Sequence, residues 1–261
     1  MQLELTGRTA LITGASQGIG RAIAERLAAA GCHLHLAARS ADDLEQARAE
    51  LTARYPVTVH CHPLDLAITA NVAALAAACG AVDILVNNAG AIPGGGLQDI
   101  GAAAWRQAWE LKVFGYIDLC RALYPAMAGR GRGVILNLIG IAGGEVTEGR
   151  YIAGTAGNAA LTAFTRALGG ISPADGIRVL GIHPGPTATG RLVRLMERNA
   201  LARGLPAERW RDLTADLPFG RPAEPAEVAD LAAFLVSDRA AYISGTLITI
   251  DGGLSARGRL F

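Results

Sequence analysis

The segment TGASQGIG, Thr13–Gly20, follows the apolar run RTALIT and leads directly into the run RAIAERLAAA. Glycines at positions 14, 18 and 20 permit a sharp turn from strand to helix, close approach of a ligand to the backbone, and tight packing of helix on strand. The N-terminus of such a helix presents N–H groups to an anionic ligand. The segment therefore predicts a βα turn that binds the phosphates of a dinucleotide, and an ordinary βα turn is the alternative.

Apolar runs alternate with segments of helical period along the whole chain. This pattern predicts an α/β fold with a Rossmann-like, doubly wound parallel seven-stranded sheet and helices on both faces, as one domain over residues 1–261. We expect strands at 8–13, 33–38, 57–62, 83–88, 133–140, 177–185 and 246–253. The expected helices lie at 21–31, 42–54, 71–79 and 104–127, through 167, at 191–215 and at 225–236.

Composition narrows the class of protein. Apolar residues make up 51% of the chain and charged residues 18%, which suits a parallel sheet buried on both faces. The formal charge of +1 favours neither nucleic acid nor an anionic membrane as a partner. We expect no membrane span, because no apolar run approaches ~18 residues. The four cysteines are widely spaced without a CxxC motif and the N-terminus lacks a signal-peptide pattern, so we expect a reducing cytoplasm.

Three motifs together resemble the short-chain dehydrogenase/reductase family over nearly the whole chain. They are TGASQGIG, the NNAG motif at 87–90, and PGP at 184–186 followed by Thr187 and Thr189. The resemblance implies an oxidoreductase that uses a nicotinamide dinucleotide and a small carbonyl or alcohol substrate. For Asp65, a strand-end cap is an equal alternative. The cofactor contacts that we expect are Gly14, Ser16, Gly18, Ile19, Gly20, Arg39, Asp65, Leu66, Asn87, Ala89, Gly90, Pro184, Gly185 and Thr187.

The end of the second predicted strand bears on the choice of cofactor. It reads LAARS, with no acidic residue to bind a ribose 2′-hydroxyl and with Arg39 in its place. A guanidinium suits a 2′-phosphate, so the sequence favours NADP(H) over NAD(H). A solvated surface arginine is the alternative.

The catalytic positions depart from the resembled family, whose tetrad is Asn, Ser, Tyr and Lys. The segment GTAGNAALTAFTRAL, 154–168, resembles the family's catalytic helix YSASKAALNAFTRAL, with Gly154 at the tyrosine and Asn158 at the lysine. Gly140 stands at the serine and Lys112 at the asparagine. The resemblance therefore describes a divergent member with a degenerate tetrad.

Tyr151 and Lys112 are the candidates to replace the missing groups. Tyr151 precedes Gly154 by three residues, so in a helix extended backward it lies about 4.5 Å along the axis on nearly the same face. Lys112 would return an ammonium from the neighbouring helix. A phenol of pKa ~10 is protonated at neutral pH and serves as an acid, which favours carbonyl reduction with Tyr151 as proton donor.

Other interpretations of these residues are open. Tyr151 can instead stand at the family tyrosine, which puts Thr155 at the lysine and shifts the match by three. Tyr151 can be a packed residue and Lys112 a solvated one. The alternative function is that of a non-catalytic dinucleotide-binding protein in which the nucleotide stabilises or signals.

The remaining features are weaker. His33, His35, His60 and His62 alternate on two neighbouring strands, and we favour neutral sheet histidines over a metal site. Residues 191–215 occupy the position of the family's substrate lid. By resemblance we expect a homotetramer or homodimer. Its aromatic contact surface would come from Trp105, Trp109, Phe114 and Tyr116.

Overall fold

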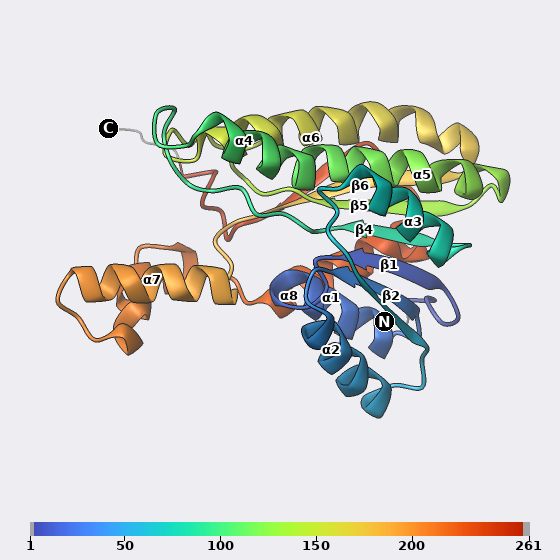
Figure 1. Cartoon of the computed structure of the whole chain (residues 1–261), viewed down its shortest axis with the longest axis horizontal. Coiled ribbons are helices and arrows are strands. Elements are labelled where there is room, and N and C mark those ends of the chain that lie inside the picture. The colour runs from blue at the N-terminus through green and yellow to red at the C-terminus, as the bar shows by residue number, and fades with distance from the viewer. Residues whose placement is uncertain (1–2, 258–261) are drawn as a thin grey trace.

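A computed structural model, described over residues 3–257, contains a single seven-stranded parallel sheet (Figure 1). The strand order is β3-β2-β1-β4-β5-β6-β7, which confirms the predicted doubly wound fold. The chain moves outward from β1 to one edge, then returns to start the other half at β4. The strands are β1 (Thr9–Thr13), β2 (His33–Ala38), β3 (Val59–Pro63), β4 (Ile84–Asn87), β5 (Gly133–Leu138), β6 (Ile177–Pro184) and β7 (Leu247–Ile250).

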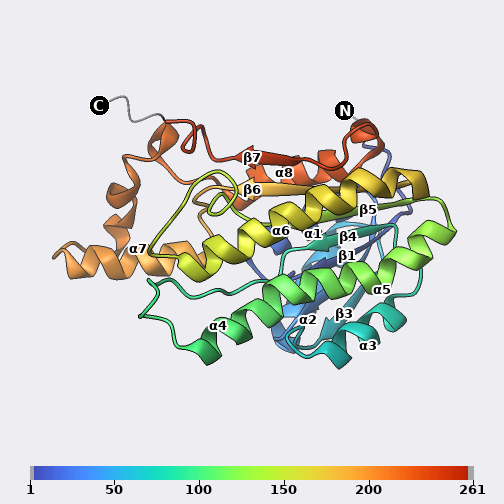
Figure 2. The same cartoon turned by 90° about the horizontal axis from the view of Figure 1, so that it is seen from above.

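Helices cover both faces of this sheet, and α7 projects away from it (Figures 1 and 2). One layer holds α1, α2 and α8, and the other holds α3, α4, α5 and α6. The helices are α1 (Gly18–Ala29), α2 (Ala41–Arg54), α3 (Thr69–Cys79), α4 (Ala102–Trp109), α5 (Gly115–Gly129), α6 (Ile152–Ile171), α7 (Gly190–Ala202) and α8 (Pro225–Val236). Short 3₁₀ turns cover Ser172–Asp175, Ala207–Thr214, Pro218–Gly220 and Asp238–Ala240.

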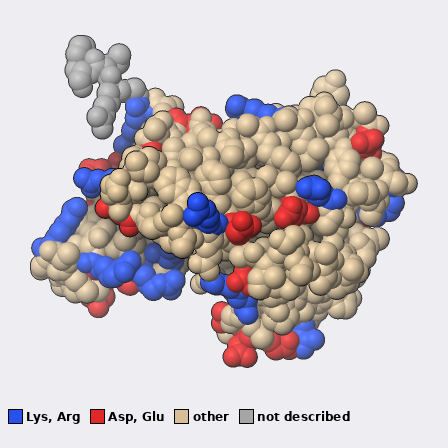
Figure 3. Space-filling model, turned by 45° about the horizontal axis from the view of Figure 1, so that its top comes forward, with Lys and Arg blue, Asp and Glu red and all other residues tan. Residues whose placement is uncertain are grey.

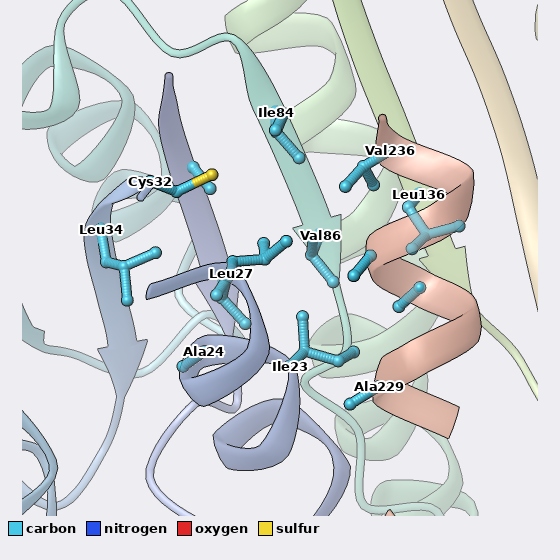
Figure 4. Packing of buried hydrophobic residues seen from close by; sticks show 14 of the residues in the cluster. Ile23, Ala24, Leu27, Cys32, Leu34, Ile84, Val86, Leu136, Ala229 and Val236 are labelled. Atoms are coloured by element: carbon cyan, nitrogen blue, oxygen red, sulfur yellow. The ribbon is translucent and has the colours of Figure 1, made fainter. Parts of the chain in front are cut away.

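Two apolar cores hold the layers together. On one face, Ile23 and Leu27 of α1 pack with Ala229 of α8 against Val86 of β4 (Figure 4). On the other face, α3, α5 and α6 pack over β1, β4, β5 and β6 through residues such as Leu119. Because both faces of these strands are buried, the strands appear in the sequence as apolar runs.

Local signals set where several helices begin and end. The hydroxyl of Ser40 accepts a hydrogen bond from the backbone N–H of Asp43 at 3.3 Å and caps α2. Glu224 and Glu227 form a reciprocal capping box at the start of α8, with Pro225 in its first turn. Gly31, with φ +85°, follows the end of α1.

Three details differ from the sequence prediction. The expected helix 104–127 is interrupted by one π-helical turn, Glu110–Phe114, which joins α4 to α5. The expected helix 191–215 is α7 followed by the 3₁₀ turn Ala207–Thr214. Helix α6 begins at Ile152, so Tyr151 is the residue before it and not part of its first turn. Within residues 3–257, no helix combines the length and hydropathy required to cross a bilayer.

Candidate functional site

A cavity of about 590 Å³ opens at the carboxyl ends of the strands. Its walls come from the ends of β1 and β4, between which the chain changes direction across the sheet, and from the loops after β2, β3, β5 and β6. Parallel α/β sheets bind ligands at this switch point. The predicted site residues that line the cavity are Gly14, Ser16, Gly18, Ile19, Arg39, Leu66, Ala89, Gly90, Lys112, Pro184, Gly185 and Thr187.

The glycine-rich turn has the backbone that the sequence predicts. Gly14 and Gly18 have φ angles of +63° and +58°, which disfavour residues with a side chain. Gly20 does not line the cavity: a Cβ there would lie 2.3 Å from the carbonyl oxygen of Gly14. The third glycine therefore permits close packing of α1, while the first two shape the wall.

Asn87 and Asp65 also lie behind the cavity wall. Asn87 is fully buried, and its Nδ2 donates to Oδ1 of Asn137 at 2.9 Å. Asp65 accepts the backbone N–H of Ala67 at 2.9 Å and so closes a local turn, as the capping alternative predicts. These side chains support the loops that form the cavity.

Arg39 stands at the rim of the cavity, at the end of β2. Its side chain is exposed, and it makes no hydrogen bond or ion pair with the described part of the chain. An unpaired guanidinium beside an anion-binding turn can take a phosphate with two parallel hydrogen bonds.

Lys112 lies on the π-helical turn, a feature that often marks functional sites. Its side chain is 8% exposed and lines the cavity. Nζ donates to the backbone oxygen of Ile139 at 2.7 Å and to Oδ1 of Asn158 at 2.8 Å. An ammonium has three N–H groups, so one is left to point at a ligand. This placement excludes the interpretation of a solvated lysine.

The burial of Lys112 changes its acidity. Burial, and to a lesser extent the positive charge of Arg191, lowers the pKa of the Lys112 ammonium to about 8. Most of the population is still charged at pH 7, because the group is then about a pH unit below its pKa. Lys112 is therefore a cation that titrates in an accessible pH range.

Tyr151 fills the space that Gly154 leaves. A Cβ built on Gly154 would lie 1.9 Å from Cε1 and 2.0 Å from Cζ of Tyr151. The ring reaches this place from a non-helical conformation, with φ −141° and ψ 41°, just before α6. The backbone of Tyr151 is held there by pairing with Gly95, in the loop between β4 and α4.

The cation next to Tyr151 is Arg191 rather than Lys112. Burial raises the pKa of the Tyr151 phenol, and the charge and side-chain hydrogen bond of Arg191 oppose that rise. Arg191 lies at the start of α7 and also donates to the backbone oxygen of Ile92 at 2.8 Å. It lines the cavity, whereas Tyr151 does not. Exposed arginines continue along α7, on the projecting segment of Figure 3.

Sequence reasoning missed Arg191 as a site residue. Its only signal was a position just after the PGP and Thr187 motif, at the first residue of the expected lid. Its contact with Tyr151, forty positions away in the chain, depends on how α7 leaves the sheet.

The aromatic residues assigned to an oligomer surface behave differently from one another. Phe114 is 45% exposed, whereas Tyr116 is 1% exposed and donates its hydroxyl to the backbone oxygen of Leu138 at 3.0 Å. The prediction was therefore wrong for Tyr116. Trp105 and Trp109 pack with Tyr151 in a small apolar cluster, and Nε1 of Trp109 donates to Ala153.

Comparison with known proteins identifies the family. A family model described as enoyl-(acyl carrier protein) reductase matches residues 14–255. Galactitol 2-dehydrogenase (L-tagatose-forming) of Cereibacter sphaeroides is 36% identical over 251 residues, which cover 96% of both chains. The chain belongs to the short-chain dehydrogenase/reductase family.

Solved structures of short-chain dehydrogenases/reductases agree with the fold. L-sorbose reductase from Gluconobacter frateurii, complexed with NADPH and L-sorbose, superposes with a TM-score of 0.92 at 32% identity and covers 98% of this chain and 99% of its own. Actinorhodin polyketide ketoreductase with NADPH gives a TM-score of 0.89 at 30% identity, covering 95% and 97%. These relatives are dehydrogenases and reductases, so the comparisons support oxidoreductase activity. They offer no support for the non-catalytic alternative.

Proposed function

We propose that this chain reduces a carbonyl compound, with Tyr151 as the proton donor, Arg191 as the cation beside it, and Lys112 as the cation of the adjoining cavity. The observation that carries the proposal is the position of the Tyr151 ring, which lies where the Cβ of a side chain on Gly154 would be. By the sequence resemblance, Gly154 stands at the position of the family tyrosine. The ring of Tyr151 therefore reaches the start of α6 beside that position from the loop before the helix.

The acidities of the groups support reduction rather than oxidation. Burial raises the pKa of Tyr151, so its hydroxyl is protonated at neutral pH and can give a proton to a developing alkoxide. Arg191 donates to that phenol and stabilises the phenolate that remains. Lys112, held by Ile139 and Asn158, has one N–H left for a ribose hydroxyl or a substrate oxygen.

NADP(H) is the cofactor that the cavity fits. When bound, it supplies the hydride for carbonyl reduction. The glycines of the turn leave the N–H groups at the start of α1 accessible to phosphate, and Arg39 is placed for a 2′-phosphate. L-sorbose reductase and the polyketide ketoreductase, both solved with NADPH, support this choice.

The proposal extends to the surroundings of the site. The segment 191–215 acts as a substrate lid, because its first residue, Arg191, is hydrogen-bonded to Tyr151. The protein works as a homo-oligomer in which exposed Phe114 contributes contact surface. All four cysteines are free thiols, which fits a cytoplasmic location.

Turnover and binding measured side by side test the function. NADPH oxidation is followed with a panel of ketoses, other ketones, aldehydes and quinones, while NADPH affinity is measured by fluorescence. We expect turnover with at least one carbonyl class, and a loss of roughly a hundredfold or more in Tyr151→Phe with nearly unchanged NADPH affinity. Tyr242→Phe, on the surface, is the matched control. Binding without turnover on any compound, or full activity in Tyr151→Phe, would contradict the proposal.

A further inference from the structure

Three metal-binding side chains meet near the β3 edge of the sheet, outside the nucleotide cavity. His35 lies on β2, His62 on β3, and Cys79 is the last residue of α3. Nδ1 of His35 is 2.8 Å from Nε2 of His62, and Sγ of Cys79 is 3.9 Å from the same Nε2. All three ligand atoms lie within 4.8 Å of one another, with His35 and Cys79 buried and His62 half-buried.

Hydrogen bonds within the cluster cannot satisfy all of its polar atoms at once. Nε2 of His62 carries either one hydrogen or one lone pair, yet it has two close neighbours, Nδ1 of His35 and Sγ of Cys79. A neutral imidazole has one ring nitrogen with a lone pair, so each of the two rings can offer one donor atom to a cation in place of these contacts.

We propose that His35, His62 and Cys79 form a zinc site. Imidazole nitrogens and a thiolate are the donors that Zn²⁺ prefers, at about 2.0–2.1 Å and 2.3 Å. Tetrahedral coordination at those lengths separates two nitrogens by about 3.3 Å and nitrogen from sulfur by about 3.6 Å. Nε2 of His62, at 2.8 Å from Nδ1 of His35 and 3.9 Å from Sγ of Cys79, needs to move by only a few tenths of an ångström to meet these separations. The third pair, Nδ1 of His35 and Sγ of Cys79, lies within 4.8 Å and closes up when the ion binds.

The fourth position goes to water or to His60, whose ring stacks on that of His35 with centroids 5.0 Å apart. Binding exchanges the Cys79 S–H bond for a sulfur–zinc bond and releases one proton to solvent. The ion then ties the end of α3 to β2 and β3. Because none of the three ligands lines the cavity, its role is to stabilise this edge of the fold.

The cluster differs from the one that the sequence suggested. Sequence spacing placed His33 beside His35 on one strand, and we favoured no metal. In the structure, Nδ1 of His33 accepts the backbone N–H of Thr58 at 3.0 Å. The thiol of Cys79, from a helix, takes the third place instead.

Cobalt binding gives a direct test, because Co²⁺ occupies zinc sites and is coloured. The protein is treated with chelator and titrated with Co²⁺, then with Zn²⁺ in competition. We expect a 1:1 complex with a thiolate-to-cobalt charge-transfer band and tetrahedral d–d bands, displaced by Zn²⁺ with a dissociation constant of about 1 µM or tighter. Saturating Zn²⁺ should raise the Tm of the full chain by roughly 5 °C or more.

Variants identify the ligands. Cys79→Ser should abolish the charge-transfer band, and Cys79→Ser and His62→Gln should each weaken Zn²⁺ binding at least tenfold. His33→Gln and Cys61→Ser are matched controls on the same strands, since the thiol of Cys61 donates to the backbone oxygen of Leu44 instead. Circular dichroism and NADPH affinity verify that each variant is folded. Absence of stoichiometric binding, or a cobalt spectrum without thiolate character in the unmodified protein, overturns the proposal whatever the variants do.

Discussion

Nζ of Lys112 donates a hydrogen bond to Oδ1 of Asn158 over 2.8 Å, which joins the π-helical turn to α6. By the sequence resemblance, Lys112 stands at the position of the family asparagine and Asn158 at that of the family lysine. That alignment describes a reciprocal exchange within one contact, since the two side chains touch. The ammonium comes from the π-helical turn and the amide from α6.

This exchange predicts that the two positions are energetically coupled. Asn158→Lys alone puts two ammonium groups in one buried contact and should lower the free energy of unfolding by on the order of 3 kcal/mol. The double variant Lys112→Asn with Asn158→Lys restores one cation and one amide, so it should recover most of that loss. Urea unfolding of the four proteins gives the coupling energy, expected to be about 2 kcal/mol. If the changes in the free energy of unfolding of the two single variants add up to that of the double variant, the contact contributes nothing to stability.

The titration of Lys112 predicts a pH limit on activity. Its pKa is about 8, so the rate of carbonyl reduction at subsaturating substrate should fall as the pH rises through about 8 and the ammonium is lost. A kcat/KM profile between pH 6 and 10 measures this limb. Lys112→Met should be less active, and its kcat/KM should no longer fall as the pH rises through about 8. If kcat/KM of that variant falls at the same pH as before, the titration belongs to another group.

The same group predicts how stability depends on pH. Its folded pKa lies below that of the unfolded chain, so between the two values the unfolded state binds more protons. The contribution of Lys112 to the free energy of unfolding therefore rises between about pH 8 and about pH 10.5, and it is lost again as the pH falls from about 10.5 to about 8. Relative to Lys112→Met, the gain should be on the order of 3 kcal/mol. Urea unfolding of both proteins at each pH measures it, and a constant difference would be the contrary result.

Arg191 should influence the pKa values of both Lys112 and Tyr151. Its charge lowers the pKa of Lys112 and opposes the rise in the pKa of Tyr151. Arg191→Gln should therefore move the descending limb of the pH profile to higher pH and lower turnover, while NADPH affinity changes little. Arg198→Gln, further along α7, is the charge-matched control. If both variants shift the pH at which kcat/KM falls by the same amount, the effect comes from the net positive charge of the lid and not from Arg191 itself.

Arg39 should set the preference for NADPH. A bidentate contact between guanidinium and phosphate is worth ~1.5–3 kcal/mol, which corresponds to about ten- to a hundredfold over NADH. Replacing Arg39 by Asp should invert the ratio of kcat/KM values. Arg48→Ala removes the same charge from α2, where it pairs with Glu45, and should leave the ratio alone. Equal use of both cofactors by the unmodified protein would rule out this role.

The fold, the family and the choice of NADP(H) could be predicted because they depend on local patterns. Apolar runs marked the seven strands, and the glycines marked a turn whose φ angles require them. The surroundings of the proposed catalytic residues depend on geometry that spacing does not encode. The loop conformation of Tyr151 turns its ring onto Gly154, and the exit of α7 brings Arg191 to the phenol. The buried position of Lys112 depends on a π-helical turn, which leaves no mark in the hydrophobic period.

The place of the Tyr151 ring also links two positions of the sequence. Any side chain at Gly154 begins with a Cβ that would lie 1.9 Å from the ring, so even alanine there must displace the phenol. A tyrosine at position 154 is therefore incompatible with the present place of the Tyr151 ring. The glycine thus makes positions 151 and 154 a single unit for any redesign of this site, because neither can be changed without regard to the other.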